Sequence, residues 1–262
     1  MKRRLSLFWI PLVLAPAALA QAQPVGSVQV SCVKARDGKT GALRQFLMET
    51  SAKMGKYRVD NGDIASLVIT EAVTPAGRSA RCDFHVVQGY SGAPKETRRT
   101  TDEDLKKAGI SMTVAQRNAK RDELSYLVTT EIWQVRDIVG TLTKGGYVRL
   151  NYFKTNSGAQ AEWLRMERSG WKQMAEVWAK DTPGRAWILH TLAMPGGTSM
   201  PYNALTVDGL PNWDSLFTGG NPRNTWTKVH PDSDYSAYMT RIGQLAERPM
   251  VATMRLLEVI RK

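Results

Sequence analysis

Two short stretches of the chain place ionisable side chains at spacings that suit acid–base chemistry. Asp83 and His85 are two residues apart, so on a strand they share one face and the carboxylate can orient the imidazole as a base. Arg149 offers the paired N–H donors that hold a carboxylate or an enolate. The other polar residues that the strand pattern groups with these three are Asn151, Asn203, His190 and Thr70. Such a group would bind a small organic molecule or move a proton on one.

The elements that must position these residues occur twice. Val28–Lys34 aligns with Val148–Lys154, and Pro75–Ser79 aligns with Pro195–Ser199, each at a spacing of 120 residues. This unit is much longer than a solenoid repeat, so it predicts two domains of one fold. We place the first repeat at residues 25–143 and the second at 144–262.

Both repeats show the element order β-α-β-β-α. Strands are predicted over residues 28–35, 64–73, 80–88, 147–154, 185–194 and 202–208. Helices are predicted over residues 40–56, 102–108, 113–139, 161–180, 232–247 and 249–259. The third of these helices is predicted to open with a capping box of Thr113 and Gln116.

A helical crossover followed by a hairpin is the split βαβ arrangement of a ferredoxin-like unit. The third strand is then expected between the first and the second. The pattern shows no fourth strand, although Val139–Leu142 could supply one in the first repeat. The predicted fold class is α+β, with tandem ferredoxin-like repeats that form an intrachain pseudo-dimer.

The chain has two cysteines, Cys32 and Cys82, which these strands make neighbours. The matching residues of the second repeat are Tyr152 and Tyr202, so in each repeat both positions of the pair carry the same residue type. The even pair predicts a disulfide, worth about 2–4 kcal/mol, and the alternative is two separate buried thiols. No metal site is expected, because there is no CxxC pair and the three histidines are scattered.

Strand parity assigns side chains to the two faces of each sheet. On the first strands, the apolar face with Val28 and Val148 is expected against the helices, which turns Arg149 and Asn151 inward. On the third strands, the face with His85 is expected to look inward. Polar groups on the inner faces would bind a ligand or satisfy one another. Trp163, Trp171 and Trp178 share one helical face, as core residues or as a wall for a flat ligand.

Residues 1–22 have the pattern of a cleaved signal peptide, with a basic start, an apolar run and small residues at the end. They predict a periplasmic or secreted protein. No later apolar stretch is long enough to span a bilayer. The net charge is +12, but the cations are scattered and no nucleic-acid-binding motif accompanies them, so no nucleic-acid partner is expected.

The stretch from Tyr147 to Leu210 carries a further pattern. Gly158, Trp171-Lys172, Trp187 and Pro195-Gly196-Gly197-Thr198-Ser199 followed by Tyr202-Asn203 resemble a group of uncharacterised secreted bacterial proteins. That group is similar to the dimeric α+β barrel superfamily. The resemblance implies two ferredoxin-like halves whose sheets face each other around a central cavity. It leaves function open, because the superfamily includes cofactor-free oxygenases, isomerases, haem enzymes and binding modules.

The leading hypothesis is a protein that binds a small organic ligand in the interior between the repeats, with no cofactor. One alternative is a cofactor-independent oxygenase or isomerase that uses Asp83, His85 and Arg149. Another is a cationic envelope protein that binds through its surface. Self-association of pseudo-dimers is left open.

Overall fold

The structure, a computed structural model, describes residues 26–94, 99–197, 200–218 and 221–262. The predicted signal peptide lies outside these residues. Within them, no helix combines the length and the apolar character that crossing a membrane requires.

Each half of the chain is a βαββαβ unit. The strands of the first half are β1 (Gly26–Ala35), β2 (Ser66–Thr74), β3 (Phe84–Tyr90) and β4 (Ser125–Gly140). Those of the second half are β5 (Tyr147–Thr155), β6 (Ala186–Met194), β7 (Ala204–Leu210) and β8 (Ala246–Arg261). As predicted, the third strand of each half lies between the first and the second.

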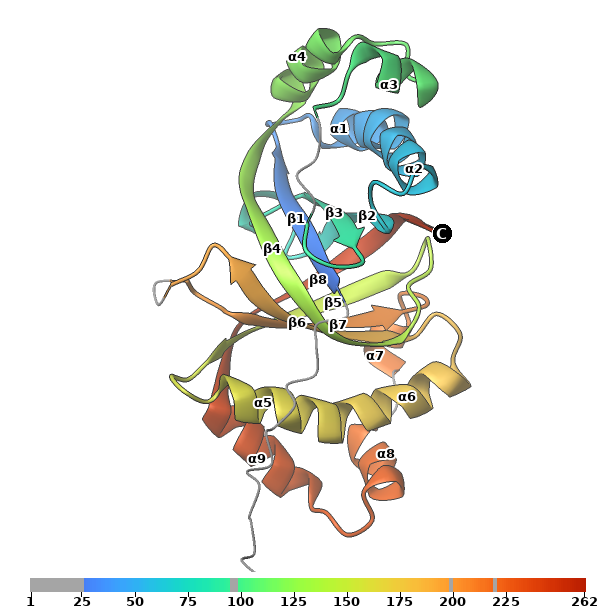
Figure 1. Cartoon of the computed structure of the whole chain (residues 1–262). Coiled ribbons are helices and arrows are strands. Elements are labelled where there is room, and N and C mark those ends of the chain that lie inside the picture. The colour runs from blue at the N-terminus through green and yellow to red at the C-terminus, as the bar shows by residue number, and fades with distance from the viewer. Residues whose placement is uncertain (1–25, 95–98, 198–199, 219–220) are drawn as a thin grey trace, which may run out of the picture.

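Helices cover the outer face of each half. The first half has α1 (Thr40–Phe46), a π-helical segment (Leu47–Ala52), α2 (Lys53–Asp60), a 3-10 turn (Gly77–Ser79), α3 (Asp102–Lys107) and α4 (Val114–Leu124). The second half has α5 (Gln160–Met166), a π-helical segment (Glu167–Trp171), α6 (Lys172–Asp181), α7 (Ser215–Thr218), α8 (Pro222–Val229) and α9 (Tyr235–Leu245). The two sets of helices lie on opposite sides of the molecule (Figure 1).

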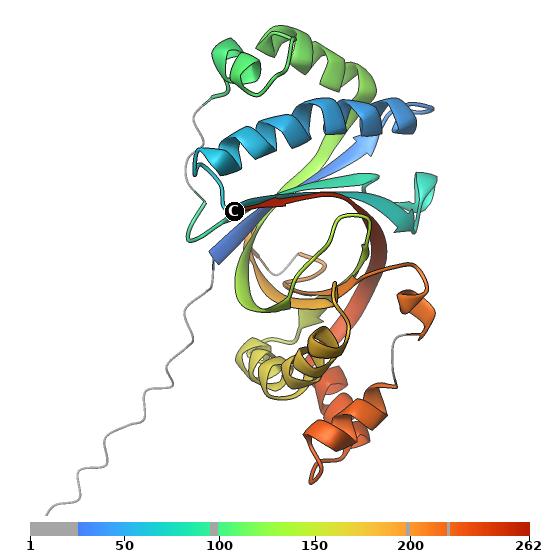
Figure 2. The ribbon, with the colours of Figure 1, turned by 90° about the vertical axis from the view of Figure 1, so that its right-hand side faces the viewer.

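All eight strands close into one antiparallel barrel in the order β1-β3-β2-β8-β5-β7-β6-β4 (Figure 2). A half turn about the barrel axis moves each strand onto its counterpart in the other half, β1 onto β5 and β2 onto β6. The two ends of the barrel are therefore different, and each end is built from equivalent positions of both halves.

The predicted long helix to Val139 and the predicted last helix, 249–259, are wrong: both regions form the missing fourth strands. The capping box of Thr113 and Gln116 does open α4, but that helix ends at Leu124. β4 then pairs with β1 along its first part and with β6 along its last. β8 pairs in the same way with β5 and then with β2. These two strands join the halves into one sheet.

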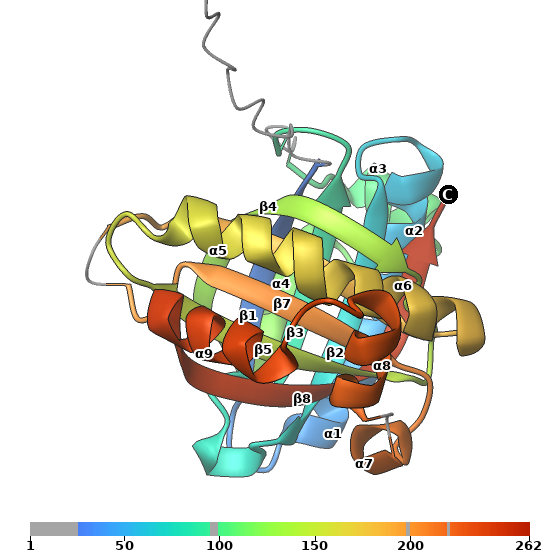
Figure 3. The same cartoon turned by 90° about the horizontal axis from the view of Figure 1, so that it is seen from below.

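The helices bury their apolar faces on the outside of the barrel. Leu43, Phe46 and Phe84 form part of the core under the first set, and Trp163 and Trp187 form part of the core under the second. Figure 3 shows α5, α6, α8 and α9 spread over the sheet of the second half. Trp163 is fully buried, so it is a core residue.

The Cys32–Cys82 disulfide is confirmed. It joins β1 to the segment just before β3, and both cysteines are buried. At the equivalent place in the second half, the rings of Tyr152 and Tyr202 are 4.6 Å apart. The two halves therefore repeat one contact with different chemistry.

Candidate functional site

A cavity of about 270 Å³ occupies the interior of the barrel. Its wall is built mainly from aliphatic side chains of both halves, among them Val28, Val30, Val68, Val87, Val148, Leu150, Ile188, Leu205 and Val207. Because a half turn relates the halves, these residues form matched pairs on opposite sides, except Leu205, whose counterpart is His85. The cavity can therefore exclude water from a small apolar molecule.

One end of the cavity carries its entrance. Ser66 begins β2, Gly140 ends β4 and Arg261 ends β8, and all three line the cavity. The opposite end of the barrel is filled by Trp133, Tyr152 and Tyr202, each at most 5% exposed.

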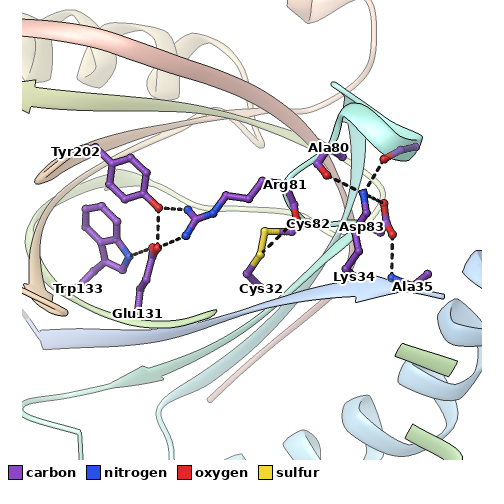
Figure 4. Close-up of a disulfide and its surroundings, with 11 residues drawn as sticks. Cys32, Lys34, Ala35, Ala80, Arg81, Cys82, Asp83, Glu131, Trp133 and Tyr202 are labelled. Atoms are coloured by element: carbon purple, nitrogen blue, oxygen red, sulfur yellow. Dashed lines mark hydrogen bonds and ion pairs between the residues drawn. A yellow bond between two sulfur atoms is a disulfide. The ribbon is translucent and has the colours of Figure 1, made fainter. Parts of the chain in front are cut away.

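A polar network holds this closed end together (Figure 4). Glu131, 3% exposed, accepts hydrogen bonds from Tyr202 Oη at 2.6 Å and from Trp133 Nε1 at 3.1 Å. Arg81 forms an ion pair with the same carboxylate at 2.9 Å and also bonds to Tyr202 Oη. The aromatic residues at this end are thereby fixed by a buried charge that has partners on both oxygens.

Three predicted site residues do line the barrel cavity: Thr70, His85 and His190. The pKa of both histidines is lowered to about 4, by burial in each case and, for His85, also by the nearby Arg81. Both imidazoles are therefore neutral at physiological pH. Among the residues that the structure describes, neither Thr70 Oγ1 nor His190 Nδ1 has a hydrogen-bond partner, although both atoms are buried.

His85 also lies beside the disulfide. A ring nitrogen of His85 and the two sulfur atoms lie within 4.8 Å of one another. The sulfur atoms are bonded to each other, so they are not the thiolates that metal ions bind.

The face assignment of the first strands is wrong. Val28 and Val148 point into the barrel, whereas Arg149 and Asn151 line a different cavity on the helix side of the sheet. Both faces of these strands are buried, one by the opposite wall of the barrel and one by helices. Apolar character therefore cannot tell one face from the other.

Asp83 and Asn203 connect neighbouring strand ends through hydrogen bonds, and neither residue lines either of the two cavities. Asp83 accepts a hydrogen bond from the backbone N–H of Ala35 at 2.9 Å and pairs with Lys34 at 3.1 Å. Asn203 accepts the equivalent backbone hydrogen bond, from Thr155, at 2.9 Å. The structure thus does not bring Asp83, His85 and Arg149 together as one group.

The sequence pattern does not single out the network residues Arg81, Glu131 and Trp133. Glu131 and Trp133 lie within a predicted helix, where their shared face is not apparent. Read as a strand, Glu131, Trp133 and Val135 alternate with less buried residues, which is the signal that places them inside.

A second cavity, of about 460 Å³, lies between the outer face of β5–β7 and the helices of the second half. Its polar wall includes Arg149, Asn151, Glu167, Arg185, Asp208 and Arg248. Asn151 Nδ2 donates to Asp208 Oδ2 at 2.8 Å and to Thr206 Oγ1 at 3.2 Å. The pKa of Glu167 is raised to about 8, mainly by burial and to a lesser extent by the nearby Asp208.

Comparison with known proteins identifies the fold. No family model and no curated protein sequence matches the chain. Among solved structures, a proposed monooxygenase of Lactobacillus acidophilus is similar over 90% of this chain and 96% of its own, with 7% identity and a TM-score of 0.53. A proposed monooxygenase of Fusobacterium nucleatum is similar over 91% and 95%, with 9% identity and a TM-score of 0.54.

Identities this low establish architecture and leave activity open. The closed eight-stranded barrel, the two βαββαβ halves and the near-complete structural matches agree with one another. The chain has the dimeric α+β barrel fold, with both halves of the barrel supplied by one polypeptide.

Proposed function

We propose that the protein binds a small, uncharged and largely apolar organic molecule inside the barrel. The observation that carries this proposal is the pair of buried polar atoms without partners among the described residues, Thr70 Oγ1 and His190 Nδ1, on residues of a mainly aliphatic wall. A buried polar atom without a partner costs free energy, and a ligand with a hydrogen-bonding group removes that cost.

The electrical character of the cavity supports an uncharged ligand. His85 and His190 are neutral at pH 7, and Arg261 lies at the entrance. An ion moved past the entrance would lose its hydration, and the lining residues of the interior offer it no opposite charge.

We also propose that the protein functions in an oxidising compartment outside the cytoplasm. The buried disulfide and the signal-like N-terminal sequence both favour a periplasmic or secreted protein. The oxygenase or isomerase alternative has less support, because Asp83 is held by Lys34 and Ala35, and Arg149 lies on the other face of the sheet. The envelope alternative rests on net charge alone.

The test is a calorimetric titration of the purified protein with 2-naphthol, which is neutral at pH 7, and with naphthalene, which lacks the hydroxyl group. We expect both to bind. The substitutions Thr70→Val and His190→Leu together should weaken 2-naphthol about tenfold, because its hydroxyl loses its partners, and should leave naphthalene unchanged or tighter.

Two results would count against the proposal. One is the absence of 2-naphthol binding to folded wild-type protein at millimolar concentration. The other is equal 2-naphthol affinity in the wild type and the double variant, because the two orphan atoms would then play no part in recognition.

A further inference from the structure

The second cavity has a chemistry opposite to that of the barrel. It lies on the other side of the sheet, where β5 and β7 face α6 and α9. Arg149, Arg185 and Arg248 all line it, and in the described part of the chain no carboxylate lies within 4.0 Å of any of them. Arg149 donates to the carbonyl oxygen of Leu216 at 3.1 Å.

The two acidic residues of this cavity offset at most part of the positive charge of the three arginines. The pKa of Glu167 is raised to about 8 by burial and by Asp208, so Glu167 carries a proton at pH 7. Burial also raises the pKa of Asp208, whereas a hydrogen bond from Asn151 and the nearby Arg149, Arg185 and Arg248 oppose this rise. The cavity therefore keeps a net positive charge, with Glu167 as a neutral hydrogen-bond donor.

A further donor lacks a partner on the same wall. Trp187 lines the cavity and is 1% exposed, and its indole N–H has no acceptor among the described residues. With the guanidinium groups and Glu167, it makes a wall that offers many donors. The complement to such a wall is a molecule rich in acceptors and negatively charged.

The apolar part of the wall is aromatic. Trp171 and Trp178 follow one another on the helix that covers the cavity, with ring centroids 5.8 Å apart and planes at 76°. Trp178 Nε1 is bonded to Thr225 Oγ1 at 3.0 Å, which fixes the orientation of that ring. Rings held in this way offer flat, rigid contact area to an aromatic ligand.

We propose that this second cavity binds an organic anion: a carboxylate on an aromatic body, with the carboxylate held by Arg149, Arg185 and Arg248 and the body packed against Trp171 and Trp178. The site is separate from the barrel cavity and takes a different class of molecule.

The test uses 2-naphthoate, which has the same rings as 2-naphthol but carries a carboxylate. We expect it to bind to the full chain in a calorimetric titration. The double substitution Arg185→Gln and Arg248→Gln should weaken it at least tenfold. The control is Arg165→Gln, which removes one charge at an exposed residue outside the cavity and so matches the single variant Arg248→Gln; it should leave the affinity unchanged.

If the double variant does not fold, Arg248→Gln alone serves, because Arg248 is exposed and its loss leaves the core intact. Affinity for 2-naphthoate should also fall as salt is raised, whereas affinity for 2-naphthol should not. The proposal is overturned if 2-naphthoate fails to bind the folded wild type, or if it binds the arginine variants and Arg165→Gln equally well. Neither outcome affects the barrel site, which the 2-naphthol titration tests separately.

Discussion

At the scale of single residues, the most consequential group is Glu131. This residue is 3% exposed, and its carboxylate accepts hydrogen bonds from Arg81, Tyr202 and Trp133. A buried charge is tolerated only when it is paired and fully hydrogen-bonded. The arrangement closes one end of the barrel with a charge that depends on its partners.

Removing the Arg81 guanidinium should therefore destabilise the folded protein. We expect Arg81→Met to lower the free energy of unfolding by about 3 kcal/mol, at the low end for a broken buried pair, because the Arg81 side chain is itself 35% exposed. Urea denaturation measures the change. The double variant Arg81→Met with Glu131→Gln should recover part of the loss. A loss equal to or greater than that of the single variant would show that the charge of Glu131 is not the cause.

The sequence predicts the placement of some candidate residues well and that of others poorly, for a physical reason. Thr70, His85 and His190 reach the barrel interior as expected, because strand alternation places them there. Arg149 and Asn151 do not, because the inner and outer faces of β5 are both buried and both carry apolar residues. The roles of Asp83 and Asn203 as ties depend on where strand ends meet in space, which one sequence does not reveal.

At the scale of elements, the central feature is the pair of long strands, β4 and β8. Leu127, Val128, Ile132 and Val135 fit helical spacing as well as strand spacing, which explains the wrong prediction. The enrichment in Val, Thr, Ile and aromatic residues after Leu124 is the better guide, because β-branched and aromatic side chains favour strands. By contrast, the first three strands of each half and their crossover helices could be predicted from periodicity and from the repeat.

The disulfide stabilises the fold by linking β1 to the segment just before β3. Cys32 and Cys82 are 50 residues apart, and their bond restricts a long loop of the unfolded chain. We expect Cys32→Ala with Cys82→Ala to lower the free energy of unfolding by about 2–4 kcal/mol. Guanidinium denaturation of the oxidised wild type and the double variant gives the difference. Tyr152→Phe, in the matching contact of the second half, is the control and should have a much smaller effect. Equal stability of the double variant and the oxidised wild type would contradict this account.

At the scale of the whole molecule, buried titratable groups make stability depend on pH in two opposite ways. The pKa values of His85 and His190 fall to about 4, so below about pH 6.5 the unfolded chain binds more protons and stability falls with decreasing pH. The pKa of Glu167 rises to about 8, so between about pH 4.5 and 8 the folded chain keeps a proton that the unfolded chain releases. That contribution falls as pH rises.

We therefore expect maximum stability near about pH 6.5, with a slope for each group of at most about 1.4 kcal/mol per pH unit. Thermal or urea denaturation from pH 4 to 9 measures the profile. Glu167→Gln should flatten the decline between pH 6.5 and 8, and His190→Leu should flatten the decline below pH 6.5. A stability curve that rises steadily to pH 9 would show that Glu167 is ionised in the folded protein.

The half-turn symmetry of the barrel has a consequence for how this protein evolves. In a homodimer with this fold, every mutation appears twice, on opposite walls of the interior, so a change that helps one wall is forced on the other. Here the two copies lie in one gene and vary independently, as the disulfide opposite a tyrosine pair and His85 opposite Leu205 illustrate. With both copies in one chain, each wall can be fitted separately to one side of an asymmetric ligand.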